Sequence, residues 1–263
     1  MLNLKSLLMK KQFIFLSVLF LLVTVAFAQL KPVEYKDGAQ VLSGFANAPQ
    51  KPLNSKAGIL ILPAWMGIDD HAKDTAIRLT DLGYYTFVAD IYGVDKRPKN
   101  ASEAGKNATY YKNNIADYQR RIQLALDQLI KQGANPDVIV VMGYCFGGTG
   151  AIEAARINMK VKGIVSFHGG LGRDENRTID FIKPKVLILH GADDFFTTDT
   201  EIRSFQNEMR SGKADWQMVY YANAVHSFTD KNAGNDNSKG VAYNEKADKR
   251  SWNAMLDFLK EVL

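Results

Sequence analysis

One cysteine stands in a pattern that could support nucleophilic chemistry. Cys145 is the only cysteine of the chain, and it lies at the centre of Gly143-Tyr144-Cys145-Phe146-Gly147. This stretch follows a β-branched run and precedes a small-residue helical pattern, which predicts a strand, a sharp turn and a helix. Glycines two residues before and after the apex are needed because a Cβ there would collide with the strand or the helix. The pattern is the nucleophile elbow G-x-S-x-G with cysteine in place of serine.

Acidic and basic partners follow later strands, in the chain order nucleophile, acid, histidine. Asp193 and Asp194 come after a strand expected over residues 185–190, and spacing alone does not separate them. His226 follows the strand expected over residues 216–221. An imidazole could take the proton from the thiol and return it to a leaving group, while an aspartate orients it. Three other histidines compete for the role of base: His71, His168 and His190.

Acyl transfer also needs donors for the oxyanion of a tetrahedral intermediate. The amide of Phe146, at the start of the expected helix, is one candidate. The loop Ala64–Gly67, after an early buried strand, supplies a second. A free thiol has a pKa of about 8.5, and a helix N-terminus and a histidine partner would both lower it.

These residues must be positioned by alternating strands and helices. Besides a hairpin within residues 29–52, apolar runs predict strands at 57–62, 84–89, 138–141, 161–167, 185–190 and 216–221. Helical spacing covers 72–82, 117–131, the stretch from the elbow to Arg156, 200–210 and 245–263, while the polar segment 96–114 is expected to be loop and short helix. Such alternation predicts an α/β fold with a mostly parallel sheet covered on both faces. No repeat or linker interrupts residues 29–263, so we expect one domain.

The N-terminus is typical of a secretory signal peptide. Lysines precede an apolar run over residues 13–26, and Ala26-Phe27-Ala28 supplies a cleavage pattern before Gln29. The alternative is an uncleaved anchor, but the run is shorter than the roughly 20 residues of a spanning helix. We therefore expect residues 1–28 to be removed, and an exported protein, periplasmic or extracellular, that does not bind a membrane.

Composition is that of a soluble globular protein, with 46% hydrophobic and 23% charged residues in a chain of 263. The formal net charge of +5 includes three lysines of the expected signal peptide, and no basic patch suggests a nucleic-acid partner. No cluster has metal-ligand spacing and no glycine-rich loop suits a phosphate. A lone cysteine in an exported protein cannot form an internal disulfide. At an elbow apex, catalysis explains it better than burial in the core.

The motifs together resemble the dienelactone hydrolase family. They are G-Y-C-F-G-G, H-G-A-D-D-F-F, A-V-H-S-F, P-A-W-M-G-I-D-D-H and V-A-D-I-Y-G, and the resemblance runs from about Val33 to Leu263. It implies an α/β-hydrolase fold and a cysteine–aspartate–histidine triad that hydrolyses esters or lactones without a cofactor. The family's aspartate lies two residues before the aromatic of D-x-F, which favours Asp194. Its second oxyanion donor corresponds to Trp65.

Two departures from the family bear on the substrate. A glutamate that helps to activate the thiol in well-studied members is replaced by Ala64, and an arginine that binds the substrate carboxylate is replaced by Asp230. A second such arginine should fall within residues 96–112, where Arg97 stands without a firm match. We therefore expect a neutral small-molecule ester or lactone rather than dienelactone itself, with thioesterase or peptidase chemistry still open. Aromatic walls of the pocket are expected from Trp65, Tyr92 and Phe195. The alternative is a catalytically impaired protein of the same fold that binds a ligand or partner.

Overall fold

The computed structural model describes residues 30–263, and the expected signal peptide lies outside them. The strands are β1 (Lys31–Asp37), β2 (Gln40–Asn47), β3 (Gly58–Leu62), β4 (Tyr85–Val88), β5 (Ile139–Tyr144), β6 (Gly163–Phe167), β7 (Lys185–Gly191) and β8 (Trp216–Tyr221). The α-helices are α1 (Asp70–Asp81), α2 (Ala101–Asn113), α3 (Ile115–Lys131), α4 (Phe146–Arg156), α5 (Asp199–Ser211) and α6 (Glu245–Val262). Two single turns of 3₁₀ helix are η1 (Val94–Lys96) and η2 (Asn237–Lys239).

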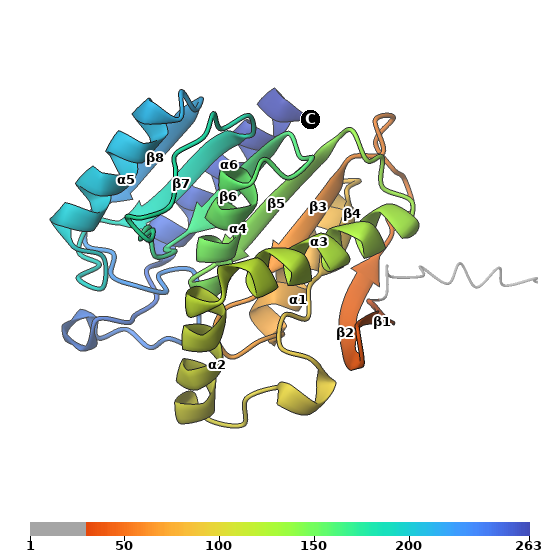
Figure 1. The fold of residues 1–263 in the computed structure, drawn as a ribbon, viewed down its shortest axis with the longest axis horizontal. Helices are drawn as coiled ribbons and strands as arrows, with labels where there is room; N and C mark the ends of the chain where they lie inside the picture. Colours follow the sequence, from red (N-terminus) through yellow and green to blue (C-terminus); the bar gives the residue numbers. More distant parts are fainter. Residues whose placement is uncertain (1–29) are drawn as a thin grey trace, which may run out of the picture.

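All eight strands form one sheet in the order β1-β2-β4-β3-β5-β6-β7-β8. β2 pairs antiparallel with β1 and β4, and every other neighbouring pair is parallel. Helices α3, α4 and α5 cover one face, and α1 and α6 cover the other (Figure 1). The α/β-hydrolase fold predicted from the sequence is confirmed.

The central strands are buried on both faces, as their continuous apolar runs require. Every residue of β3, β5 and β6 is buried. Side chains that alternate along these strands enter two separate cores. One contains Ile122 of α3 and Phe205 of α5, and the other contains Leu79 of α1 and Met255 of α6. The sheet therefore forms a rigid support between two helical layers.

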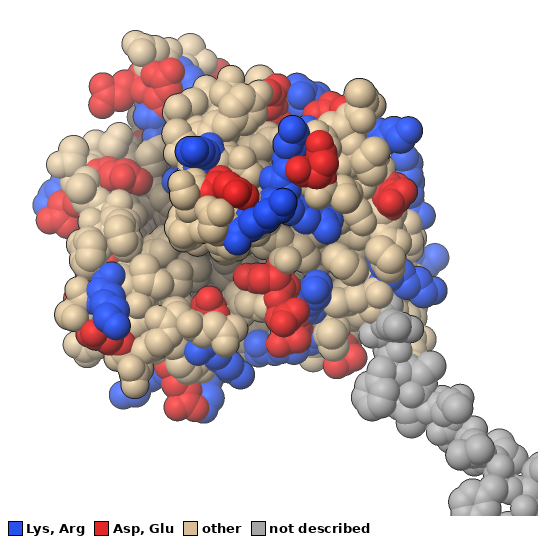
Figure 2. Space-filling model, turned by 90° about the horizontal axis from the view of Figure 1, so that it is seen from below, with Lys and Arg blue, Asp and Glu red and all other residues tan. Residues whose placement is uncertain are grey.

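The parallel strands end at one edge of the sheet, which faces downward in Figure 1. The loops after β3, β5, β7 and β8 meet there, as expected for strands that run in the same direction. Figure 2 looks onto this side and shows a hollow whose visible lining consists mainly of uncharged residues, with charged residues around it. This edge carries the candidate site.

The segment 96–114 differs from its prediction, because α2 is a full helix of 13 residues rather than a short one. The Asn100 side chain accepts the Glu103 amide at 3.0 Å, and the Glu103 carboxylate accepts the Lys99 amide at 2.8 Å. This arrangement resembles a capping box, which satisfies free amides at the helix start. Ala104 and Ala108 are among the few residues that α2 buries, so its apolar stripe is too narrow to stand out in the sequence.

The remaining elements lie within a few residues of their expected positions. β5 continues to Tyr144, three residues past the predicted strand end, because Met142, Gly143 and Tyr144 remain in the buried ladder with β6. Among the helices of residues 30–263, none is both long enough and apolar enough to span a bilayer.

Candidate active site

Cys145 occupies the sharp turn between β5 and α4 that the sequence predicts. Its backbone has φ 52° and ψ −114°, a left-handed conformation that is strained for a residue with a side chain. A Cβ on Gly143 would overlap the carbonyl of Gly147, and a Cβ on Gly147 would overlap the carbonyl of Leu62. The two glycines therefore allow α4 to start directly against β5 and against the end of β3. Cys145 is part-exposed at this corner.

The structure brings His226 and Asp194 together. His226 Nδ1 lies 2.8 Å from Asp194 Oδ2, and the other oxygen of Asp194 accepts the Phe196 amide at 3.1 Å. Asp194 is 4% exposed, whereas Asp193 is exposed. Burial and hydrogen bonding thus favour Asp194, the residue that the family resemblance also favours.

The loops that carry these two residues are tied to each other and to the chain that follows. His226 donates its amide to the Gly240 carbonyl at 3.2 Å and accepts the Ala242 amide at 3.2 Å. The Asp193 amide donates to the carbonyl of Ala224 at 3.0 Å. Backbone hydrogen bonds therefore fix the loop that carries the His226 imidazole, although this loop belongs to no helix or long strand.

The pKa values of Cys145 and His226 move in opposite directions. Burial lowers the pKa of His226, but the Asp194 carboxylate and the Cys145 sulfur more than offset this, and the pKa rises to about 10. Burial raises the pKa of Cys145. His226, the Phe146 amide and the Lys112 ammonium lower it by more than burial raises it, so the net shift is downward. The arrangement favours a thiolate–imidazolium pair.

The pKa of the Cys145 thiol is thus lowered by groups other than the glutamate that well-studied family members have at the position of Ala64. The Phe146 amide belongs to the elbow and was predicted as an oxyanion donor. No sequence signal pointed to Lys112, which lies near the C-terminus of α2, the helix whose length was not predicted.

Trp65 lies in a tight turn beside the elbow. The Gly67 amide donates to the Ala64 carbonyl at 2.9 Å, and the Tyr92 hydroxyl donates to the Trp65 carbonyl at 2.8 Å. Within the described residues the Trp65 amide has no hydrogen-bond acceptor. Tyr92 is only 3% exposed, so it supports this turn through its hydroxyl and contributes little to an exposed pocket wall, the role expected for it from the sequence.

Large apolar side chains are exposed on the loops that carry the candidate site. Phe195 is 62% exposed and lies on Gly240, and its neighbour Phe196 is 55% exposed and packs 5.5 Å from the His226 ring. Trp65 and Met66 are also part-exposed on the loop after β3. Trp65 and Phe195 were expected from the sequence as aromatic walls, whereas the exposure of Phe196 and Met66 was not.

The two positions that bear on a substrate carboxylate both have other partners. Arg97 forms an ion pair with Asp90 at 2.9 Å and donates to the Ser43 carbonyl at 2.7 Å. Burial lowers the pKa of His71, and Asp230 lies close enough to this ring to oppose that shift. In residues 30–263, no group of three or more metal-binding side chains is arranged to hold an ion.

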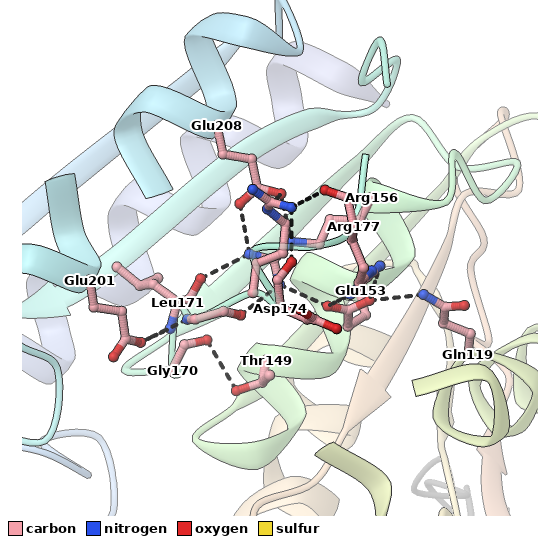
Figure 3. Close-up of polar contacts among 12 residues, drawn as sticks. Gln119, Thr149, Glu153, Arg156, Gly170, Leu171, Asp174, Arg177, Glu201 and Glu208 are labelled. Carbon is pink, nitrogen blue, oxygen red and sulfur yellow. Dashed lines mark hydrogen bonds and ion pairs between the residues drawn. The ribbon is translucent and has the colours of Figure 1, made fainter. Parts of the chain in front are cut away.

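A cavity of about 320 Å³, lined mainly by polar and charged residues, begins one helical turn beyond Cys145. Thr149, whose amide donates to the Cys145 carbonyl, lines it together with Lys112 and Glu201. The Thr149 hydroxyl donates to the Gly170 carbonyl at 3.1 Å, and Glu201 accepts the amides of Leu171 and Gly172, both at 2.7 Å (Figure 3). These contacts fix the loop after β6 as one wall of the cavity.

Buried ion pairs hold this wall against α4. Glu153 binds Arg156 at 2.7 Å and Arg177 at 2.9 Å, and Arg156 also binds Glu208 of α5 at 2.8 Å (Figure 3). Arg156 further donates to the carbonyls of Leu171 and Gly172. Since Glu153 and Arg156 are almost fully buried and every charge has a partner, the network is a rigid support for α4 and the loop.

Comparison with known proteins identifies the family. A model of the dienelactone hydrolase family matches residues 42–263. The chain belongs to the dienelactone hydrolase family. A dienelactone hydrolase-like promiscuous phosphotriesterase from metagenomic libraries is 36% identical, with a TM-score of 0.82, over 89% of this chain and 98% of its own. The structure named m3DLH is 31% identical, with a TM-score of 0.85, over 90% and 99% of the two chains.

Curated relatives agree. A Yersinia pestis protein provisionally named a carboxymethylenebutenolidase is 23% identical over 216 residues, which cover 77% of each chain. An uncharacterised Caenorhabditis elegans protein is 33% identical over 122 residues, 46% of this chain and 77% of its own. The resemblance carried by the sequence motifs is confirmed, and this dienelactone hydrolase family member is a carboxylic ester or lactone hydrolase.

Proposed function

We propose that Cys145, His226 and Asp194 form a catalytic triad that hydrolyses a neutral carboxylic ester or lactone through a thioester on Cys145. One observation carries the proposal: the His226 ring is hydrogen-bonded to a buried carboxylate and close enough to the only thiol for each to shift the pKa of the other. A thiolate is the reactive form of cysteine, and an imidazolium beside it stabilises that form.

In the first half-reaction the Cys145 thiolate attacks the carbonyl carbon of the substrate. The carbonyl electrons move to oxygen, and the oxyanion accepts hydrogen bonds from the amides of Phe146 and Trp65. The tetrahedral intermediate collapses, the bond to the leaving oxygen breaks, and the His226 imidazolium gives that oxygen its proton. The acyl group remains on sulfur as a thioester.

In the second half-reaction neutral His226 removes a proton from water, and the resulting hydroxide attacks the thioester carbonyl. The same two amides stabilise the oxyanion, and the thiolate leaves as the carboxylic acid forms. His226 is again an imidazolium, with its Nδ1–H held by Asp194, so the resting pair is regenerated.

The surroundings favour a neutral substrate with an apolar group. Trp65, Phe195 and Phe196 are exposed on the loops that carry the site, and they offer apolar area and no charge. Arg97 is engaged by Asp90, so it is not free to bind a substrate carboxylate. We assign the polar cavity beyond Thr149 to the part of the substrate remote from the ester bond.

The direct test uses p-nitrophenyl acetate and the protein before and after iodoacetamide. We expect alkylation of Cys145 to abolish release of p-nitrophenol, and C145A to behave like the alkylated protein. Hydrolysis that persists after complete alkylation, confirmed by mass spectrometry, would rule out Cys145 as the nucleophile. Intact binding of an ester without turnover would instead support the ligand-binding alternative.

A second activity is favoured by the 36% identical neighbour, which is named a promiscuous phosphotriesterase. A thiolate on Cys145 could attack the phosphorus of a neutral phosphotriester and expel its most acidic alcohol. With paraoxon, we expect at least one equivalent of p-nitrophenol per active site, and C145A should release none.

We also propose that the protein is exported after removal of residues 1–28. The support is the sequence alone, with its lysines, apolar run and Ala-x-Ala pattern. Mass spectrometry of the protein from the producing cell should find Gln29 as the first residue, in a fraction outside the cytoplasm. A cytoplasmic protein that retains Met1 would refute this.

A further inference from the structure

A second histidine lies against the ring of His226. His168 follows β6 directly, is 3% exposed, and has a backbone φ of 40°. Its ring centroid lies 5.2 Å from that of His226, with the planes inclined by 64°. Phe196 packs on His226 at 5.5 Å and 78°. The rings of His168 and Phe196, from the loops after β6 and β7, therefore pack on the imidazole of His226.

His168 is anchored by a hydroxyl from the loop that carries His226. His168 Nε2 lies 2.9 Å from Thr229 Oγ1, and the same oxygen lies 3.3 Å from His71 Nε2 on α1. Thr229 is buried and follows His226 by three residues. The contact thus ties the histidine loop to the end of β6 and to the start of α1.

His168 is a neutral partner. Burial lowers the pKa of His168 well below its usual value, and the neighbouring charges of His226 and His71 lower it further, with His190 acting in the same direction. The rings packed on it are those of His226, Phe228 and, at 6.0 Å, Tyr144. His71 itself is flanked by Asp69, Asp230, Asp248 and Arg78. A neutral ring can therefore stay beside the His226 cation without repelling it.

We propose that His168 is a positioning residue: its buried ring, anchored through Thr229 to His71, keeps the imidazole of His226 turned toward Cys145. The proposal rests on the triad proposed above, since it acts through His226 and touches no substrate. Its physical basis is that His226 lies in a loop without regular secondary structure. The orientation of its ring about the Asp194 contact must therefore come from what packs against its faces.

The test measures the rate of Cys145 alkylation by iodoacetamide as a function of pH, which reports the thiolate without requiring turnover. The variants are H168A, which removes the ring, H168F, which keeps a neutral ring, and T229V, which removes the anchor. The control is Y221F, because the buried Tyr221 hydroxyl has no hydrogen-bond partner in the described chain, and the substitution keeps the ring that packs on Phe228.

For the wild type we expect a midpoint below the ordinary thiol pKa of about 8.5. H168A should raise this midpoint by about 1 pH unit and T229V by about half as much, because His226 no longer stays beside the sulfur. H168F should stay closer to the wild type than H168A, and Y221F should match the wild type. A change in folding alone would lower the melting temperature without moving the midpoint of the folded protein.

A folded H168A with a wild-type midpoint would overturn the proposal. If H168A does not fold, an unchanged midpoint in T229V would overturn it in the same way. A wild-type midpoint at the ordinary thiol value has a different meaning, because it contradicts the thiolate–imidazolium pair and with it the triad. The two failures are therefore distinguishable.

Discussion

Asp194→Asn is the substitution that isolates the carboxylate from the rest of the site. The pKa of His226 rises to about 10 from an ordinary value of 6.5. At 1.36 kcal/mol per pH unit, this corresponds to roughly 5 kcal/mol of net preference for the imidazolium, which Asp194 and Cys145 produce against the opposing effect of burial. A carboxylate about 4 Å from a cation contributes on the order of 4 kcal/mol at an effective dielectric constant of 20. Asp194 therefore accounts for a large part of that preference.

Loss of this charge should act on catalysis in two ways. The imidazolium becomes easier to deprotonate, so the thiolate loses its counter-ion, and the His226 tautomer is no longer fixed by an acceptor at Nδ1. We expect kcat/KM for p-nitrophenyl acetate to fall by roughly 10³- to 10⁴-fold, the scale seen when a triad aspartate is changed to asparagine. The alkaline limb of the pH–rate profile should move well below 10.

Asp193→Asn is the matched control, because Asp193 is the neighbouring residue, carries the same charge and is exposed, whereas the hydrogen bond to the His226 ring comes from Asp194. It should change kcat/KM by less than about 3-fold, as expected for an exposed charge. Both proteins should be folded by circular dichroism. A folded D194N that keeps kcat/KM within 10-fold of the wild type would refute the assignment of Asp194, and equal losses in both variants would refute the specificity of the contact.

The same geometry leads to three further predictions. Gly147→Ala should reduce kcat at least about 100-fold in steady-state assays, because a Cβ there overlaps the Leu62 carbonyl and displaces the Trp65 amide, whereas an intact rate would mean that this donor is not used. The wild-type pH–rate profile should rise through the lowered pKa of Cys145 and fall near pH 10 as His226 loses its proton; a fall near pH 6.5 would contradict the raised pKa. Glu153→Gln should lower the free energy of unfolding in urea by about 3 kcal/mol at pH 7, because buried Arg156 and part-buried Arg177 lose a shared carboxylate. Interactions with Arg156 and Arg177 outweigh burial and lower the pKa of Glu153, so its contribution is present above the unfolded value of about 4.5 and is lost as the pH falls through the folded value; a wild-type-like acid transition in E153Q would contradict this.

The elements nearest Cys145 could be predicted because their signals are local. The elbow is encoded by two glycines, each two residues from Cys145 in the sequence. β3 and β7 are encoded by continuous apolar runs, which are typical of strands that are buried on both faces. The order cysteine, aspartate, histidine then follows from which strands end at the same edge.

Other features depend on contacts that the sequence does not reveal. Spacing alone does not separate Asp193 from Asp194; only the resemblance to the family's D-x-F motif favours Asp194, and the turn after β7 agrees with it by burying Asp194 and exposing Asp193. His168 and Thr229 meet His71 across strands and a helix far apart in the chain, so no spacing signals their contact. The helix α2 is an intermediate case, since Asn100 and Glu103 form a recognisable start but few of its residues are buried.

Capture of the acyl-enzyme tests the role of Cys145 most directly. The protein is mixed with a slowly hydrolysed ester, quenched in acid within the first turnover, digested and examined by mass spectrometry. The proposed mechanism predicts an acyl group on the peptide that contains Cys145, removed by hydroxylamine and absent in C145A. An ester that is hydrolysed at the normal rate while Cys145 stays unmodified at every quench time, or an acyl group found on another residue, would contradict it.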